Sequence, residues 1–283
     1  MHATYDETIT RALDVFEKVH RDTPIDGLNW IFDHAETISA RSIDRVAALG
    51  GGIAFQHRMA YQGEYFVDRY GAKAAEATPP FKRVLEAGVP TSAGTDATRV
   101  ASYDPWVSLS WLVTGKTLGG LSLYPQRNLL DRETALRMWT EKATWFSNEE
   151  GKKGQIKVGQ LADLAVLSED YFAVPADRIR QLQSVLTLLG GKVVYAAAEY
   201  APLGPTLPPP MPDWSPVRQF GGYWKADSAG EVPGVTAKIA ANCGCAHACG
   251  VHGHNHARAA SAALPVADLK SFWGALGCAC WAV

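Results

Sequence analysis

The sequence has 283 residues, of which 47% are hydrophobic, and its 27 basic and 29 acidic residues nearly balance. A chain of this size can bury a substantial core, and its even charge argues against a dedicated nucleic-acid-binding protein. The first residues lack the basic-then-apolar order of a signal peptide, and no apolar run is long enough to span a bilayer. We therefore expect a soluble, cytoplasmic protein without a nucleic-acid or membrane partner.

The first 150 residues alternate between helical and strand patterns. Apolar residues at helical spacing predict a helix over residues 5–20, Ser39 opens a second helix, and a third precedes residue 88. Short buried runs typical of strands occur three times, over residues 28–34, 53–56 and 89–93. The aromatic, glycine-containing residues 59–70 have the composition of a long active-site loop. This repeated order of strand and helix predicts a parallel sheet or barrel.

The pattern changes in the following hundred residues. Asp104 and Asp131 each cap a predicted helix, the second reaching about residue 147. Residues 114–117 resemble the end of a phosphate-binding loop, but the earlier glycine and the preceding strand are missing, so we exclude nucleotide binding. Short strands over residues 154–167 and a β-hairpin over residues 185–195 then lie outside the alternating pattern. They predict a small separate sheet.

Polar residues stand at the ends of the predicted strands. His34 ends one strand, Asp96 follows another, and His2 lies where a preceding strand would have ended. Because the carboxyl ends of parallel strands face the ligand crevice, Asp96 is placed for chemistry. Each residue also has a simpler explanation, which is an Asx-turn or helix N-cap for Asp96 and a structural hydrogen bond for either histidine.

Four segments together resemble a known family: His2 with the helix behind it, Asp33-His34-Ala35, Gly94-Thr95-Asp96, and residues 154–167. In order and spacing they resemble the carboxyl-terminal half of amidohydrolase superfamily enzymes. In particular they resemble amidohydrolase family 3, the metal-dependent hydrolases typified by N-substituted formamide deformylases. The resemblance covers residues 2 to about 200. It implies an α/β fold, namely the distal part of a (β/α)8 barrel with a divalent metal at the carboxyl ends of its strands.

The resemblance also implies roles for single residues. His2, His34 and Asp96 would hold the metal, with zinc as the expected ion, since imidazoles and a carboxylate suit it and leave a position for water. Asp96 would be the catalytic residue that takes a proton from this water and passes it to the leaving nitrogen. Three further residues are expected to bind the substrate: His57, Arg58 and Arg99. For His57 an incidental position is the alternative, and Asp163 is expected to be structural only.

Part of the family pattern is absent. The first-strand His-x-His pair and the fourth-strand bridging ligand have no counterpart, because the sequence resembles the family only from the end of the fifth strand onward. A free half-barrel would expose a sheet edge and apolar faces. We therefore expect either a fragment whose amino-terminal half is missing, or a chain completed by a partner, including a second copy of itself.

The carboxyl-terminal quarter has a different composition. Residues 202–216 are dense in proline and read as a stiff linker. Beyond residue 240 lie eight candidate metal ligands: Cys243, Cys245, Cys249, His252, His254, His256, Cys278 and Cys280. Alternate residues share a face in extended backbone, so these side chains could form a second metal site. The alternative is a partly disordered tail rich in glycine and alanine.

These observations give a full set of expectations. The predicted segments are a partial barrel (residues 1–150), strands of a small β domain (151–201), a proline-rich linker (202–242) and a Cys/His-rich tail (243–283). The predicted function is metal-dependent hydrolysis of an amide-like, non-peptide C–N bond in a small amide or formamide-like molecule, with activity incomplete in this chain alone. The alternative is a non-catalytic metal-binding or assembly protein derived from a degenerate barrel.

Overall fold

The structure is a computed structural model that describes residues 1–97, 100–206, 248–249 and 254–255. The chain divides into two units, Met1–Leu207 and Pro208–Val283. In the second unit the described backbone is one antiparallel strand pair, β8 (Ala248–Cys249) and β9 (His254–Asn255). The side chains of the eight predicted ligands of the tail, and nearly all of the predicted linker, lie outside the described residues.

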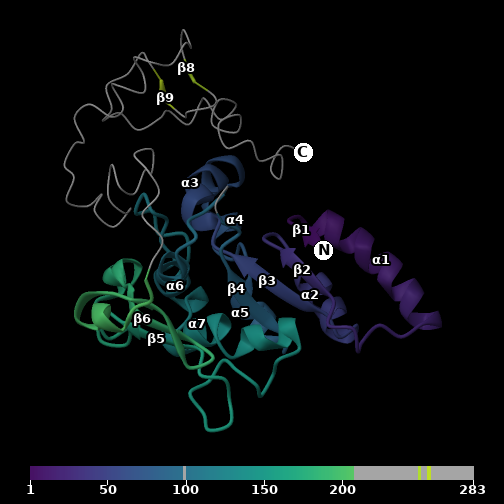
Figure 1. Cartoon of the computed structure of the whole chain (residues 1–283). Coiled ribbons are helices and arrows are strands. Elements are labelled where there is room, and N and C mark those ends of the chain that lie inside the picture. Colours follow the sequence, from purple (N-terminus) through teal and green to yellow (C-terminus); the bar gives the residue numbers. More distant parts are fainter. Residues whose placement is uncertain (98–99, 207–247, 250–253, 256–283) are drawn as a thin grey trace. The chain divides into compact units, whose positions relative to one another are not determined.

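The first unit combines two sheets with surrounding helices (Figure 1). The strands are β1 (His2–Ala3), β2 (Ile31–His34), β3 (Gly52–Gln56), β4 (Thr91–Gly94), β5 (Leu164–Leu167), β6 (Ser184–Leu189) and β7 (Lys192–Ala196). The α-helices are α1 (Asp6–Asp22), α2 (Ala40–Ala48), α3 (Met59–Tyr70), α4 (Ala72–Ala75), α5 (Phe81–Glu86), α6 (Pro105–Thr114) and α7 (Arg132–Trp139). Short 3-10 helices are η1 (Gln126–Asn128), η2 (Lys142–Ser147), η3 (Ala176–Gln181) and η4 (Ala198–Leu203).

The first four strands form a parallel sheet in the order β1-β2-β3-β4. Helices connect successive strands, so the predicted alternation of strand and helix and the parallel sheet are confirmed. Every residue of β3 is buried, as expected for an interior strand that is covered on both faces. All four carboxyl ends therefore point the same way, which places the residues that follow them at one edge. Closure into a complete barrel stays a prediction.

Helices α1 and α2 cover the sheet with their apolar faces. Ile9 and Leu13 of α1 and Ile43 and Val46 of α2 are buried. Ser39 caps α2 by accepting a hydrogen bond from the Ser42 backbone N–H at 3.2 Å. The amphipathic pattern that predicted both helices is therefore explained by burial of one stripe against the sheet.

Residues 59–70 are a helix, so the prediction of a long loop is wrong. Met59, Gly63 and Phe66 of α3 are buried, which is the spacing of one helix face. Gly63 reflects close packing, because a Cβ atom there would lie 2.6 Å from Leu123 Cδ1 and 2.7 Å from Thr117 Cγ2. The glycine that suggested a loop instead lets a distant segment approach the helix.

Both caps predicted at Asp104 and Asp131 are present, but the helix that follows Asp131 is shorter than expected. Asp104 caps α6 and Asp131 caps α7, each accepting a hydrogen bond from a backbone N–H. A single helix from residue 131 to about 147 is wrong, because the backbone of Thr140 (φ −120°, ψ −92°) leaves the helical region and a separate 3-10 helix follows. The cap is a local signal, whereas the end of the helix is set by the chain's packing.

Substitution of Asp131 by alanine is expected to lower the free energy of unfolding by about 1 kcal/mol. The carboxylate accepts from the Thr134 backbone N–H at 2.8 Å and from its hydroxyl at 2.7 Å, and these hydrogen bonds hold the pKa of Asp131 below its usual value. Urea unfolding at pH 7 measures the change. Asp131→Asn keeps a capping oxygen and should recover most of the loss, so equal destabilisation by both variants would contradict the capping role.

The predicted small sheet is present as three antiparallel strands in the order β5-β6-β7. Gly190 and Gly191 form the tight turn between β6 and β7 with φ values of +56° and +80°, which suit glycine. Asp163 Oδ1 accepts a hydrogen bond from the Gly190 backbone N–H at 2.7 Å, consistent with a structural residue. A separate domain over residues 151–201 stays a prediction, since this sheet lies in the same unit as the parallel one.

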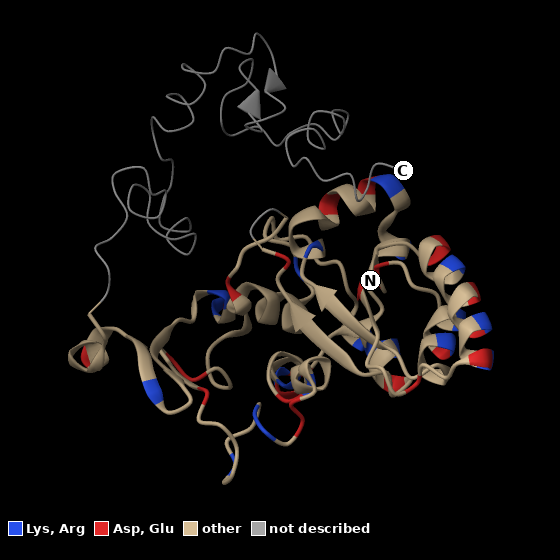
Figure 2. Cartoon of the chain, turned by 45° about the vertical axis from the view of Figure 1, so that its right-hand side comes forward, with Lys and Arg blue, Asp and Glu red and all other residues tan. Residues whose placement is uncertain are grey.

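Acidic and basic residues are interspersed over the described elements, and no face is dominated by one sign in the view of Figure 2. This distribution agrees with the near balance of 27 basic and 29 acidic residues in the sequence. Among the described residues, none of the helices combines the length and the apolar character that crossing a bilayer would require.

Candidate active site

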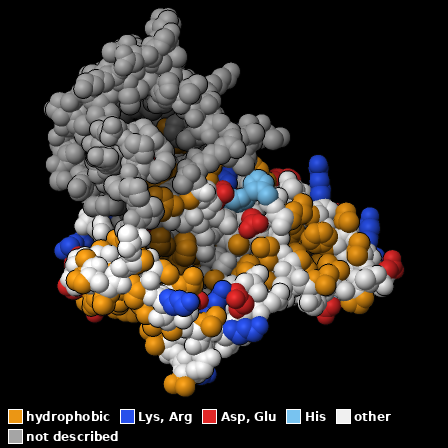
Figure 3. Space-filling view, in the orientation of Figure 1, with side chains coloured by type: hydrophobic (Ala, Val, Ile, Leu, Met, Phe, Trp, Pro, Cys, Tyr) orange, Lys and Arg blue, Asp and Glu red, His pale blue; other side chains and the backbone are white. Residues whose placement is uncertain are grey.

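The candidate site lies where the parallel strands end. His34 is the last residue of β2. Glu36, Arg58 and Asp96 each lie two residues beyond a strand, after β2, β3 and β4 respectively. Because these strands are neighbours in the sheet, the three charged side chains form a row with the arginine in the middle. On the face shown in Figure 3, histidine and acidic side chains lie next to each other.

The distances define a compact polar cluster. Asp96 Oδ2 lies 4.0 Å from His34 Nε2 and 3.5 Å from Arg58 Nη2, and Arg58 Nε lies 3.6 Å from Glu36 Oε1. The side chains of Arg58 and Glu36 are 1% exposed, whereas that of Asp96 is 42% exposed. The His2 ring meets the His34 ring edge to face with centroids 4.4 Å apart. Asp96 is thus the accessible carboxylate of the cluster. The Arg58 and Glu36 side chains next to it are buried.

The backbone at this cluster adopts an uncommon conformation. His34 (φ +79°), Ala35 (φ +46°) and Asp96 (φ +53°) all lie in the left-handed region. For residues other than glycine this region costs about 1 kcal/mol or more, and such positions are concentrated at functional sites. These residues lie at the ends of β2 and β4, where His34 Nε2 and Asp96 Oδ2 are 4.0 Å apart.

Burial shifts the protonation of the cluster. Burial, the Arg58 charge and the neighbouring His2 lower the pKa of His34 to about 3, so its imidazole is neutral at pH 7. Burial raises the pKa of Glu36 to about 7, although Arg58 acts in the opposite direction. At neutral pH Glu36 is therefore only partly ionised, so Arg58 lies between a partly ionised carboxyl group and Asp96.

The three predicted substrate contacts differ in position. Arg58 belongs to the cluster, whereas His57 Nδ1 lies 3.4 Å from the carbonyl oxygen of Gly94, at the end of β4, and its ring lies against Tyr61 of α3. Both His57 and Arg58 are fully buried. Burial lowers the pKa of His57 to about 4. This position is consistent with the alternative of an incidental histidine, and Arg99 lies outside the described residues. Substrate binding by the three residues stays a prediction.

The donor set partly suits a metal ion. Zinc is held at about 2.0–2.2 Å from nitrogen and oxygen ligands, so the 4.0 Å between His34 Nε2 and Asp96 Oδ2 is a gap that one ion could bridge. The His34 imidazole is also neutral, as a ligand must be. However, residues 1–97 and 100–206 contain no group of three or more His, Cys, Asp and Glu side chains arranged for a metal. In the described arrangement these three residues are therefore not such a group, and metal binding by His2, His34 and Asp96 stays a prediction.

Glu36 is the member of the cluster that the sequence reasoning missed. Both of its carboxylate oxygens are buried, and neither accepts a hydrogen bond within the described residues. Its position two residues past β2 matches those of Arg58 and Asp96 past their strands. This equivalence is a signal that could have identified it.

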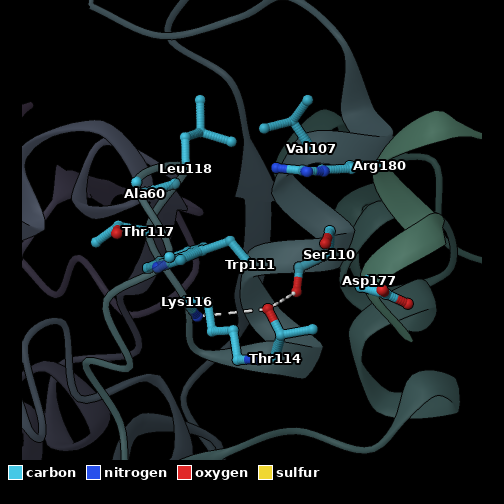
Figure 4. Close-up of a pocket in the computed structure, with 12 residues that line it drawn as sticks. Ala60, Val107, Ser110, Trp111, Thr114, Lys116, Thr117, Leu118, Asp177 and Arg180 are labelled. Carbon is cyan, nitrogen blue, oxygen red and sulfur yellow. Dashed lines mark hydrogen bonds between the residues drawn. The ribbon is translucent and has the colours of Figure 1, made fainter. Parts of the chain in front are cut away.

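A separate cavity of about 180 Å³ lies beside α6 (Figure 4). Trp111, Lys116, Leu118 and Arg180 are among the residues that line it. Thr114 donates its hydroxyl to the Ser110 carbonyl oxygen and accepts from the Lys116 backbone N–H. Residues 114–117 therefore follow the carboxyl end of a helix, where the dipole disfavours phosphate. The exclusion of a phosphate-binding loop is consistent with this geometry.

Comparison with known proteins places the chain in a family. Residues 1–195 match the family model described as the amidohydrolase family. The chain is 26% identical over 199 residues to YtcJ of Bacillus subtilis (strain 168), which is named as an amidohydrolase, covering 69% of this chain and 37% of that protein. It is 27% identical over 197 residues to an N-substituted formamide deformylase of Arthrobacter pascens, covering 69% of this chain and 36% of that enzyme.

A solved structure shows the same fold. The crystal structure of an uncharacterized metal-dependent hydrolase from Pyrococcus horikoshii matches 62% of this chain and 35% of its own, with a TM-score of 0.53 and 24% identity. The chain thus spans little more than a third of each of these proteins. Because the family model matches more than half of its residues, the chain belongs to the amidohydrolase family.

Proposed function

We propose that this chain is the distal part of a hydrolase that cleaves an amide-like, non-peptide C–N bond in a small molecule. The observation that carries the proposal is the accessible Asp96 carboxylate, held at the carboxyl edge of a parallel sheet beside the neutral His34. Family membership supports hydrolysis. The relative from Arthrobacter pascens, named as an N-substituted formamide deformylase, supports an amide or formamide-like substrate.

Asp96 has the position of a general base and acid. Its carboxylate is 42% exposed, so a water molecule can reach it, and the Arg58 guanidinium lies 3.5 Å away. We propose that it accepts a proton from the attacking water and passes it to the leaving nitrogen, a role worth about 10²–10⁴-fold in rate.

We further propose that the complete enzyme uses a divalent metal, with zinc as the expected ion. His34 and Asp96 are the described side chains that can contribute to it, and His2 is the nearest further imidazole. Other ligands are needed, since these three are not arranged as a site. The isolated chain is therefore expected to turn over substrate slowly or not at all.

The proposal is tested by completing the fold. The unmatched amino-terminal part of the Arthrobacter pascens deformylase is fused ahead of this chain, and release of amine from N-substituted formamides and N-acyl amines is measured with added zinc. We expect turnover by the fusion and little by the chain alone. Asp96→Asn should reduce turnover by about 10²-fold or more.

Asp44→Asn is the matched control. Asp44 of α2 pairs with Arg83 of α5 at the surface, 2.7 Å away, and belongs to none of the contacts of the cluster, so its replacement should leave turnover unchanged. A folded fusion that hydrolyses none of these substrates would contradict the proposed reaction. Full activity of the Asp96→Asn fusion would contradict the role of that residue.

A further inference from the structure

Arg58 occupies the centre of a three-membered charge row. It extends from the segment after β3, the strand between β2 and β4, and it lies between Glu36 and Asp96. Guanidinium is a permanent cation and is held here without contact with bulk water, at 1% exposure. The row therefore contains one fixed positive charge between two carboxyl groups.

The carboxylate oxygen that faces Arg58 is the one that faces His34. Asp96 Oδ2 is the atom in both contacts, at 3.5 Å from Arg58 Nη2 and 4.0 Å from His34 Nε2. An ion bridging Asp96 and His34 would have to bind this oxygen, close to the guanidinium. A divalent cation and Arg58 would then repel each other in a poorly solvated place, where charge interactions are stronger than in water.

We propose that Arg58 is an internal competitor for metal at this site, neutralising Asp96 in the arrangement described and opposing any divalent ion between Asp96 and His34. Metal binding then requires the guanidinium to leave Asp96, and Glu36, 3.6 Å from Arg58 Nε, is an acceptor beside it. This explains why two imidazoles and a carboxylate lie together without forming a metal site. The inference concerns ion binding by this chain and does not depend on hydrolysis of any substrate.

The test measures binding of Mn²⁺ to the full chain by electron paramagnetic resonance of the free ion. Mn²⁺ prefers carboxylate, carbonyl and water oxygens, so the cysteines and histidines of the tail interfere little, and any binding by the tail is the same in all variants. Arg58→Met keeps the apolar length of the side chain and removes the charge. We expect it to bind one Mn²⁺ about tenfold more tightly, or better, than the unaltered chain, given the strength of a nearby buried charge.

Two further variants link the gain to this site. Addition of Asp96→Ala to Arg58→Met should abolish the new binding, and Arg58→Lys, which keeps a charge, should bind as weakly as the unaltered chain. Arg45→Met is the matched control, because Arg45 pairs with Asp14 and Glu17 on the outer helices; it should change nothing.

In Arg58→Met the buried Glu36 carboxyl group would lose the cation beside it, which could prevent folding. If it does, the Mn²⁺ measurement uses the double variant Glu36→Gln/Arg58→Met, which removes both charges. Equal Mn²⁺ affinity in the folded variant and the unaltered chain would overturn the proposal. Tight, Asp96-dependent binding by the unaltered chain would overturn it as well. The Mn²⁺ measurement is independent of the fusion experiment. If the fusion released no amine, the proposed reaction would fail, but the conclusion about Arg58 would not change.

Discussion

Replacement of Phe81 by alanine is expected to lower the free energy of unfolding by about 3–5 kcal/mol. Phe81 opens α5 and is 1% exposed. Its ring meets those of Phe55, Trp111 and Tyr124 at centroid distances of 6.4, 5.6 and 5.6 Å. It therefore joins a strand of the parallel sheet to α6 and to the segment after it. Truncation would leave a cavity that rigid neighbouring rings fill poorly.

Urea unfolding followed by tryptophan fluorescence measures this loss. Phe172→Ala is the matched control, since Phe172 is 58% exposed and a surface truncation is expected to change stability by about 0.5 kcal/mol or less. Similar losses for the two variants would show that the aromatic cluster does not stabilise the first unit.

Acidification is expected to destabilise the fold through its buried histidines. The pKa of His57 is lowered to about 4 by burial, against about 6.5 in an unfolded chain. Between these two values the unfolded state binds more protons, so stability present above pH 6.5 is lost as the pH falls toward 4. At 1.36 kcal/mol per pKa unit the loss from His57 is about 3 kcal/mol. The lowered pKa of His34 acts in the same direction.

Glu36 opposes this trend, so the measurement compares variants. Its pKa is raised to about 7, which favours the folded state as the pH falls through the same range. Unfolding free energies of the unaltered chain and of His57→Gln are therefore measured at pH 8, 7, 5.5 and 4. The difference between the two proteins should be constant from pH 8 to 7 and should shift in favour of the variant below pH 6.5. A difference independent of pH would contradict the buried neutral histidine.

Local signals predicted much of the fold. Three strands were identified from short apolar runs, and Ser39, Asp104 and Asp131 were identified as caps because each cap depends on residues within three positions. Helix α3 was missed because Gly63 owes its presence to Leu123 and Thr117, more than fifty positions away. Contacts of that separation leave no periodic trace in the sequence.

For the candidate site, the sequence predicted which strand ends meet but not which charged side chains would be buried there. The rule that parallel strands share an edge brought His34 and Asp96 together, and the structure has them 4.0 Å apart. The buried pair of Arg58 and Glu36 was not foreseen as a pair, since charged residues are usually exposed and only the fold shows them to be enclosed. The family resemblance also did not indicate that the Arg58 guanidinium would lie 3.5 Å from the Asp96 carboxylate.

The left-handed backbone at His34, Ala35 and Asp96 has a consequence for engineering the protein. Glycine adopts such conformations without steric penalty, so a search for thermostable variants should repeatedly select glycine at these three positions. At Ala35 the exchange removes a fully buried methyl group, so lost packing offsets part of the gain, but the polar cluster is not touched. At His34 and Asp96 the same exchange deletes the side chains proposed to act on water and metal. Stability and activity are thus opposed at two of these positions and independent at the third.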